Sequence, residues 1–160
     1  MTVRVTDELL GELVASSWAE GIFALGVAAA IEHDEKILLI GPSGNDFDPI
    51  WQLPSGLVLP GETLFDALGR MISLTSGLNL RDVTGYDGHH DRLMSDEVVR
   101  TFVFNVTVGD PTRICESAYI AHRWSSEPIT DSLVVTELHR SLSAHSTKPA
   151  QPGFNRSTDL

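Results

Sequence analysis

The chain has 160 residues, of which 42% are apolar and 21% are charged, proportions typical of one soluble globular domain. Its formal net charge is −11 at pH 7, and its eleven Lys and Arg residues are scattered without forming a basic patch. This balance argues against a nucleic-acid polymer or an anionic membrane as partner. Small phosphorylated ligands stay open, because a metal ion or backbone N–H groups can bind phosphate in an acidic protein.

Cysteine content and hydropathy predict a cytoplasmic protein. Cys115 is the single cysteine, so no intramolecular disulfide can form, and we expect it to behave as a small apolar residue. The sequence contains no run of about 18 apolar residues, as a membrane span would need. It does not start with a basic segment followed by an apolar one, as a signal peptide would. We therefore expect a reducing, cytoplasmic location and no membrane partner.

The N-terminal part of the chain predicts a helix and a β-hairpin. Thr6 precedes two acidic residues and a periodic apolar stretch, which is typical of a helix start, and this helix should end near residues 18–21. Residues 22–31 and 36–40 are largely apolar, and His33-Asp34-Glu35 separates them as a turn. The two stretches therefore predict a hairpin.

The middle of the chain predicts a loop, an extended segment and a second helix. Residues 41–49 contain Gly, Pro, Ser, Asn and Asp, which are turn formers and indicate a loop. Residues 51–58 read as an extended segment. Residues 63–76 predict a helix that ends at Gly77, a natural C-cap.

The C-terminal part predicts three strands and a last helix. Residues 80–86 indicate a strand, and residues 87–97 are polar and predict a loop. Residues 98–108 alternate between apolar and polar side chains, as does the segment 118–124, so both predict strands. Thr130 and the apolar positions after it predict a helix to about Ala144.

This order of elements predicts one α/β domain, a mixed sheet between helices, over residues 1–144. Residues 1–20 would form its N-terminal helix. Residues 145–160 lack an apolar period and are rich in turn formers, so we expect a disordered tail.

The segment 56–78 resembles the Nudix box, whose family pattern is G-x5-E-x7-R-E-U-x-E-E-x-G-U, with U an apolar residue. The lead-in WQLPSG, residues 51–56, resembles the family's W-x-L-P-G-G, with Ser55 in place of one glycine. The resemblance covers roughly residues 20–144 and implies the Nudix fold, a mixed β-sheet sandwiched between α-helices. The matching box positions are Gly56, Glu62, Arg70, Ile72, Gly77 and Leu78.

The box departs from the family at its metal-binding positions, which hold Met71, Leu74 and Thr75. In the family, glutamates at these positions bind Mg²⁺ or Mn²⁺ against a diphosphate. Their spacing of i, i+3 and i+4 places them on one helix face. A thioether, an isobutyl group and a hydroxyl are poor ligands for a hard divalent cation. We therefore expect no metal here and no metal cofactor.

The helix of the box should carry a wide apolar arc, which extends to the side that would face the ligand cleft. Glu62 and Arg70 remain, and the resemblance implies that they shape the box loop rather than react. Trp51 could stack on a ligand at the cleft mouth or pack beneath the loop. The arc comprises Leu64, Phe65, Ala67, Leu68, Met71, Ile72 and Leu74.

Other residues could supply acid–base chemistry. The candidates are His89, His90, Asp96 and Glu97 in the polar segment 85–97. Neighbouring residues of an extended chain point in opposite directions, so the two histidines would not bind one metal together. A solvated loop is the simpler interpretation. Displaced general bases are conceivable at Asp46, Asp48 and Glu116, whereas His122 should be half-buried and hydrogen-bonded.

These observations leave the protein's status as an enzyme open. The leading hypothesis is a Nudix-fold protein that has lost ordinary metal-dependent diphosphate hydrolysis. It would use the cleft to bind a small organic or nucleotide-like molecule, or to perform metal-independent acid–base chemistry on it. The expected ligand-binding residues are Trp51, Glu62, Arg70, Met71, Leu74 and Thr75. The alternative is an active hydrolase of a nucleoside diphosphate derivative with a relocated Mg²⁺ or Mn²⁺ site. A third hypothesis is an interaction module whose cleft is filled by Met71 and Leu74. A homodimer through the apolar N-terminal helix is also open, by analogy.

Overall fold

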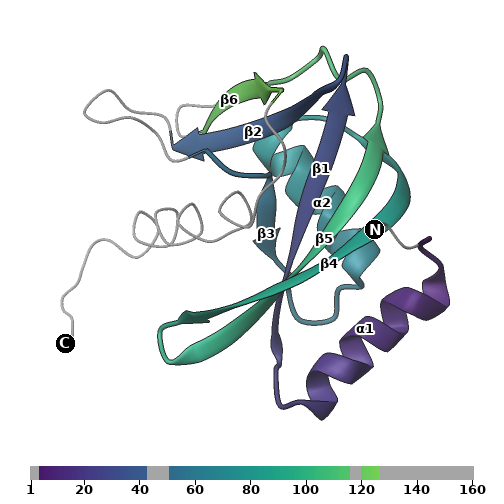
Figure 1. The fold of residues 1–160 in the computed structure, drawn as a ribbon, viewed down its shortest axis with the longest axis vertical. Helices are drawn as coiled ribbons and strands as arrows, with labels where there is room; N and C mark the ends of the chain where they lie inside the picture. Colours follow the sequence, from purple (N-terminus) through teal and green to yellow (C-terminus); the bar gives the residue numbers. More distant parts are fainter. Residues whose placement is uncertain (1–3, 43–50, 116–119, 127–160) are drawn as a thin grey trace.

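A computed structural model of the chain describes residues 4–42, 51–115 and 120–126. The helix expected over 130–144 and the tail 145–160 lie outside the described residues. None of the helices in these described ranges is long and apolar enough to cross a membrane. In chain order the elements are α1 (Asp7–Ala19), β1 (Ala24–His33), β2 (Lys36–Pro42), β3 (Ser55–Leu57), α2 (Leu64–Ser76), β4 (Leu80–Met94), β5 (Glu97–Val108) and β6 (Ile120–Ser125) (Figure 1).

The strands form one mixed sheet. Its order is β4-β5-β1-β2-β6, and β3 pairs with β1 beside this path. The pairing of β1 with β5 is parallel, in the register Ala24–Val99 to Ile31–Val106, and the other pairings are antiparallel. The expected α/β architecture with a mixed sheet is confirmed, as is the hairpin turn between β1 and β2.

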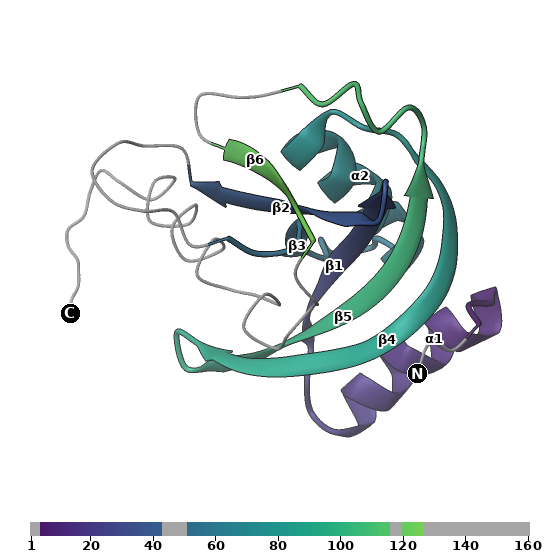
Figure 2. The ribbon, with the colours of Figure 1, turned by 45° about the horizontal axis from the view of Figure 1, so that its top comes forward.

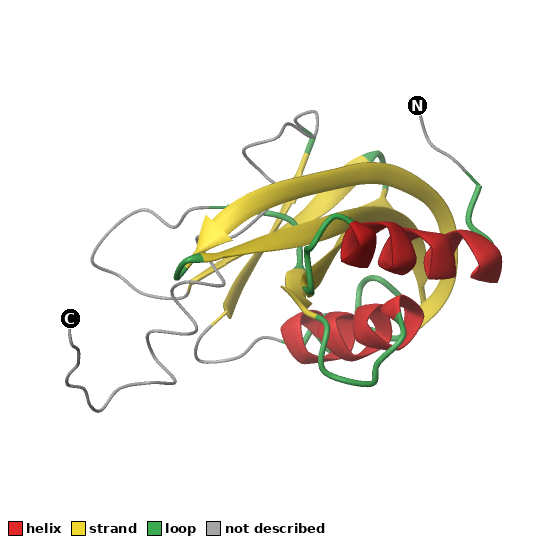
Figure 3. Ribbon diagram, turned by 90° about the horizontal axis from the view of Figure 1, so that it is seen from below, coloured by secondary structure: helices red, strands yellow, loops and turns green. Residues whose placement is uncertain are grey.

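The main core lies between the sheet and the two described helices (Figure 3). Alternate residues of β1, among them Val27 and Ile31, face α2, because successive side chains of a strand point to opposite faces. Leu10 of α1 and Leu68 of α2 pack into the same core. The opposite face of the sheet has its own small cluster, comprising Ala28, Leu39, Leu53 and Val103.

Three of the four ends of the described helices are marked by capping residues, of which Thr6 and Gly77 were predicted. The Thr6 hydroxyl accepts a hydrogen bond from the Leu9 N–H at 3.1 Å, and the Thr63 hydroxyl accepts one from the Asp66 N–H at 3.0 Å. Gly77 ends α2 with a φ of 76°, in the left-handed region that glycine adopts at little cost. Local capping interactions therefore mark the start of both helices and the end of α2.

The loop predicted over residues 87–97 is wrong, because β4 continues to Met94. The segment His89–Met94 pairs with residues 97–102 of β5, and the two strands form a hairpin that extends from the body of the domain (Figure 2). Ser95 and Asp96 make the turn with φ values of 49° and 69°, as a two-residue hairpin turn requires. We call residues 89–102 the arm. Its side chains are largely exposed on β4, so the sequence there is polar although the backbone is paired.

Candidate functional site

The loop that leads into α2 is held by an ion pair between Glu62 and Arg70. The Arg70 Nε and Nη2 atoms donate to the two Glu62 carboxylate oxygens at 2.8 and 2.9 Å, and Nη2 also donates to the Leu57 carbonyl at 2.6 Å. The Leu59 N–H donates to Glu62 Oε1 at 2.8 Å. The Arg70 hydrogen bonds, followed by the Leu59 N–H, lower the pKa of Glu62 to about 2. Both residues are thus engaged in shaping the loop.

The three positions that carry metal-binding glutamates in the Nudix box lie in different surroundings here. Met71 is buried at 2% exposure, and Thr75 is buried with its hydroxyl donating to the Met71 carbonyl at 2.8 Å. Leu74 is 69% exposed. The expected apolar arc therefore needs correction, since Phe65 and Leu74 are exposed. The buried stripe runs along positions 64, 68, 71 and 75, because these are three or four residues apart on a helix of 3.6 residues per turn.

The donor atoms at these positions do not fit a divalent cation. Met71 and Leu74 supply no side-chain oxygen, and the Thr75 hydroxyl is used within its own helix. A cation such as Mg²⁺ needs charged or carbonyl oxygens. Within the described ranges, no group of three His, Cys, Asp or Glu side chains could hold a metal ion.

Met71 fills the space between α2 and β3. A Cβ atom on Gly56 would lie 3.0 Å from Met71 Cγ, so the side chain rests directly against the β3 backbone. Of the two side chains that the interaction-module hypothesis places in the cleft, Met71 packs between α2 and β3, whereas Leu74 is exposed.

His122 of β6 reaches the C-terminal end of α2. Its Nε2 lies 2.6 Å from the Thr75 carbonyl oxygen, and because a carbonyl only accepts, Nε2 must carry the proton. This confirms the prediction of a half-buried, hydrogen-bonded histidine. The contact itself could not be read from the sequence, since the two residues are 47 positions apart.

Two buried acceptor atoms beside this contact have no hydrogen-bond partner among the described residues. They are His122 Nδ1 and Gln52 Oε1. Both residues are cross-strand partners of Ile40, so they flank it on the same face of the sheet. No pattern in the sequence pointed to Gln52, which lies in the lead-in to the box.

The predicted acid–base residues lie on the arm rather than beside the C-terminal half of α2 (Figures 1 and 2). His89 pairs with Phe102 and His90 with Thr101, so the two histidines point to opposite faces of the sheet. The His89 ring packs edge-on against Phe102 with centroids 6.1 Å apart. Asp96 is in the exposed turn at the tip, and the exposed Glu97 begins β5.

A buried arginine joins the arm to α1. Arg100 donates to the Asp91 carboxylate at 2.8 and 2.9 Å and to the Glu20 carboxylate at 3.0 and 3.1 Å. These hydrogen bonds lower the pKa of both carboxyl groups. His89 lies close enough to lower the pKa values of Glu20 and Asp91 slightly further. The structure thus groups His89 with this ion-pair network.

Trp51 belongs to the other side of the sheet. It packs against the cluster of Ala28 and Val103, opposite α2, and the Arg123 guanidinium lies 5.8 Å from its ring centroid. The structure therefore separates Trp51 from Met71 and Thr75. The candidate general bases Asp46, Asp48 and Glu116 lie outside the described residues.

Comparison with known proteins links this geometry to one fold. No protein-family model matches the chain. Its sequence is 34% identical over 90 residues to an ADP-ribose pyrophosphatase of Methanocaldococcus jannaschii, an alignment that includes 54% of this chain. The chain spans about half (53%) of the length of that relative.

Solved structures show the same fold over most of the chain. A MutT Nudix hydrolase from Burkholderia pseudomallei superposes with a TM-score of 0.56 at 25% identity, covering 68% of this chain and 91% of the other. A UDP-X diphosphatase superposes with a TM-score of 0.57 at 20% identity, covering 94% and 76% respectively. The mixed sheet and the helix α2 therefore define a Nudix-fold protein. Its similarity in sequence to an ADP-ribose pyrophosphatase agrees with the Nudix resemblance of the chain.

Proposed function

We propose that this protein belongs to the Nudix family and binds a nucleoside diphosphate derivative without using a metal at the box helix. The observation that carries the proposal is the burial of Met71 and Thr75, which occupy two metal-binding positions of the box and offer no free oxygen. Glu62, the carboxylate that remains, is held by Arg70 and the Leu59 N–H. The box helix therefore offers no set of side-chain ligands for a metal ion that would support hydrolysis of a diphosphate.

The class of ligand follows from the similar proteins. The relative is named for ADP-ribose and the structural neighbour for UDP-X. Both names describe a nucleotide whose diphosphate joins a second group. The shared fold supports a ligand of the same class, a nucleoside diphosphate derivative, for this chain. The names of the similar proteins do not indicate which member of that class it is.

Calorimetry and turnover assays on the full chain test the proposal. ADP-ribose, a UDP-sugar and ADP would be titrated with 5 mM Mg²⁺, with 1 mM Mn²⁺ and with EDTA, concentrations that are roughly those at which such cations bind weak protein sites. We expect at least one nucleotide to bind equally well with EDTA, without release of a nucleoside monophosphate. Turnover that requires Mg²⁺ or Mn²⁺ would contradict the proposal, and so would the absence of binding across the panel.

A variant that restores two box glutamates provides the control. Leu74→Glu/Thr75→Glu places carboxylates at one exposed and one buried box position near the C-terminal end of α2, and we expect it to bind Mn²⁺ more tightly than the natural chain does. This comparison shows whether the fold still presents these positions to a cation. Equal Mn²⁺ binding by both proteins would mean that the cation binds elsewhere.

A second candidate function is an active hydrolase with a relocated metal site. The observation that favours it is the 34% identity to an ADP-ribose pyrophosphatase. Its acidic residues would be Asp96 and Glu97 on the arm, together with Asp46 and Asp48. Metal-dependent turnover that Asp96→Asn/Glu97→Gln abolishes would establish it. Turnover that persists in EDTA and falls on His89→Ala or His90→Ala would instead indicate metal-independent acid–base chemistry.

A further inference from the structure

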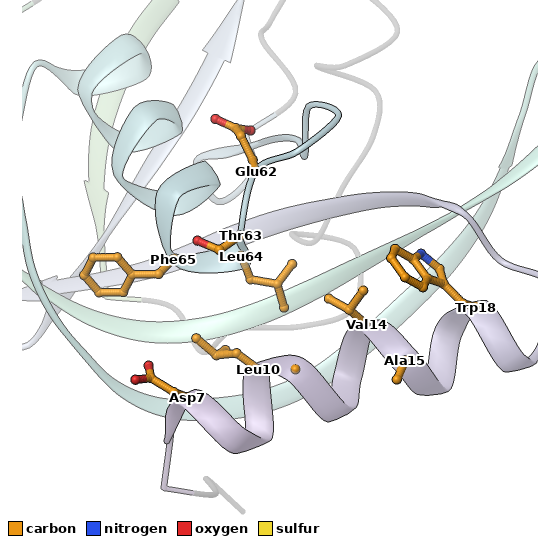
Figure 4. A pocket seen from close by; sticks show the side chains of 10 residues that line it. Asp7, Leu10, Val14, Ala15, Trp18, Glu62, Thr63, Leu64 and Phe65 are labelled. Atoms are coloured by element: carbon orange, nitrogen blue, oxygen red, sulfur yellow. The ribbon is translucent and has the colours of Figure 1, made fainter.

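The contact between α1 and the start of the box leaves two adjoining apolar hollows. The larger, of about 560 Å³, lies between α1 and the first turn of α2 (Figure 4). The smaller, of about 290 Å³, lies beside the loop that leads to Glu62. Val14, Trp18 and Glu62 line both hollows, which therefore form one continuous surface, called here the α1 groove. Along α1 it runs from Asp7 to Trp18, a length of roughly 17 Å or three helical turns.

The α1 groove presents apolar side chains and open space to solvent. Trp18 is 55% exposed, and Phe23, Leu59 and Phe65, which also line the hollows, are exposed as well. Gly11 lies in the middle of α1, where glycine is less favourable than alanine. A Cβ atom at Gly11 would meet no described residue within 4 Å, so packing inside this part of the chain does not require the glycine. Close approach of another molecule along α1 accounts for both the open space and the exposed rings.

The rim of the α1 groove is acidic. Asp7 lines the larger hollow. Glu8 and Glu12 are exposed, and each lies three residues before a small residue that lines the same hollow, so both carboxylates stand beside the groove. None of these three acids forms an ion pair with another described residue, and α1 contains no Lys or Arg. Arg4 is the one cation close to them in the sequence, so most of this negative charge is uncompensated.

This charge selects a basic partner. Glu8 and Glu12 repel each other, because like charges four residues apart destabilise a helix, and a bound Lys or Arg would remove that cost. A second copy of this chain would instead bring further carboxylates to the same surface. An anionic membrane or a nucleic-acid backbone would be repelled as well.

The backbone around the α1 groove selects the shape of the partner. β1, the strand that reaches the smaller hollow, already pairs with β3 and β5 on its two sides, so it offers no free edge to an extended peptide. An apolar hollow cannot satisfy the N–H and C=O groups of such a peptide either. A helix satisfies its own backbone groups and places apolar side chains three and four residues apart on one face.

We propose that the α1 groove is the docking site for a basic amphipathic helix of a partner protein. The apolar face of that helix enters the two hollows, and its Lys or Arg side chains pair with Asp7, Glu8 and Glu12. The inference does not rest on the proposed function, because it uses only the charges and hollows beside α1. It places the partner against residues 58–62, the loop that leads into the box helix.

Fluorescence anisotropy with synthetic peptides tests the proposal on the full chain. The probe is a labelled peptide of about 14 residues with leucine at every third or fourth position and lysine elsewhere. We expect it to bind with a Kd of about 10 µM or below in about 0.1 M salt. A peptide of the same composition without the helical period, and one with glutamate in place of lysine, should bind at least roughly 10-fold more weakly. Equal binding of the three peptides, or no binding up to about 200 µM, would overturn the proposal.

A matched pair of variants tests the acidic rim. Glu8→Lys/Glu12→Lys reverses the charge beside the groove, and Glu32→Lys/Glu35→Lys makes the same change in net charge at the turn between β1 and β2, far from α1 (Figure 1). We expect the first variant to weaken binding of the basic peptide at least roughly 10-fold and the second by less than about 3-fold. Equal losses would mean that the peptide responds only to net charge, contrary to a site at α1.

A second pair tests the hollows without changing the charge. Gly11→Gln fills the α1 groove, and Ser16→Gln adds the same side chain to the exposed face of α1 outside the groove lining. Only Gly11→Gln should weaken peptide binding, by roughly 10-fold, and its unfolding temperature should not fall, because glutamine favours a helix more than glycine does. Unchanged binding by Gly11→Gln would contradict the site. Sedimentation at about 50 µM tests the other occupant, since a dimer of the natural chain that Gly11→Gln dissociates would assign the groove to a second copy and overturn the proposal.

Discussion

The two ends of the box segment differ in what their polar groups do. At the N-terminal end, Glu62 and Arg70 make hydrogen bonds to each other and to the backbone of the loop. At the C-terminal end, the three metal-binding positions are apolar or turned inward, and Met71 packs against β3. The pair that shapes the loop is thus separable from the carboxylates that would bind a metal. A box can keep the geometry of its loop and helix without keeping a ligand set.

The largest expected effect comes from returning a glutamate to position 71. Met71→Glu should destabilise the domain by about 3–5 kcal/mol, because it buries an unpaired carboxylate against β3. Burial raises the pKa of such a group, so the cost should shrink as the pH falls toward about 4. Urea unfolding at pH 7.5 and pH 4.5 measures both effects.

Leu74→Glu is the matched control for this substitution. It adds the same charge on the same helix at an exposed site, so its effect should stay within about 0.5 kcal/mol. Equal costs for the two variants would show that positions 71 and 74 share one environment, contrary to the burial of Met71 and the exposure of Leu74.

The second largest effect should come from the glycine that ends α2. Gly77 has a positive φ, and a Cβ there would lie 2.7 Å from the Cys115 Cβ. Gly77→Ala should therefore cost about 2–4 kcal/mol, from backbone strain together with the clash. Gly61 also has a positive φ, but a Cβ there would have no neighbour within 4 Å among the described residues, so Gly61→Ala should cost only about 1 kcal/mol. The difference in unfolding free energy between these variants isolates the contact with Cys115.

How far the sequence predicts this molecule depends on the range of the interactions involved. The predicted caps Thr6 and Gly77 act on their own helices, and the helix ends predicted from them are right. Thr63, which was expected to be the first helical residue, is the N-cap of α2. The arm was missed because the pairing of β4 with β5 satisfies the backbone of a polar segment, and no alternation of apolar residues marks it. A long exposed hairpin is held by backbone pairing between its strands, so its sequence need not alternate between apolar and polar side chains.

The candidate site shows the same difference between local interactions, which the sequence predicts, and contacts between distant segments, which it does not. The box spacing indicated Glu62, Arg70 and the loss of the glutamates, since all of these lie within one segment. It did not indicate that Leu74 is exposed while Thr75 is buried, because that depends on how α2 is rotated against the sheet. The box spacing also did not indicate that His122 donates a hydrogen bond to the Thr75 carbonyl, because only the fold brings these two residues together.

A third prediction concerns how the stability provided by the Glu62–Arg70 ion pair, at the N-terminal end of the box, depends on pH. The pKa of Glu62 is lowered to about 2, so its ion pair contributes stability above pH 4.5 and loses that contribution as the pH falls toward 2. The natural chain should therefore be more stable than Glu62→Gln by a constant amount between pH 5 and pH 8, and the difference should shrink below about pH 4.5. Thermal unfolding midpoints of both proteins across this range measure it. A difference that does not change with pH would mean that the charge of Glu62 contributes nothing beyond its hydrogen bonds.

The smallest expected effect on stability concerns the Thr75 hydroxyl, at the C-terminal end of the box. The Thr75 hydroxyl donates to the Met71 carbonyl, which is already an acceptor within the helix, so Thr75→Val should change stability by no more than about 0.5 kcal/mol. Ser76 is the matched position, because its hydroxyl both donates to the Ile72 carbonyl and accepts from the Leu78 N–H at 3.2 Å. Ser76→Ala leaves that N–H without its partner and should cost about 1–2 kcal/mol. If Thr75→Val also abolished binding of a nucleotide in EDTA, the Thr75 hydroxyl would have to turn outward toward the ligand, and the box would retain one working oxygen at its C-terminal end.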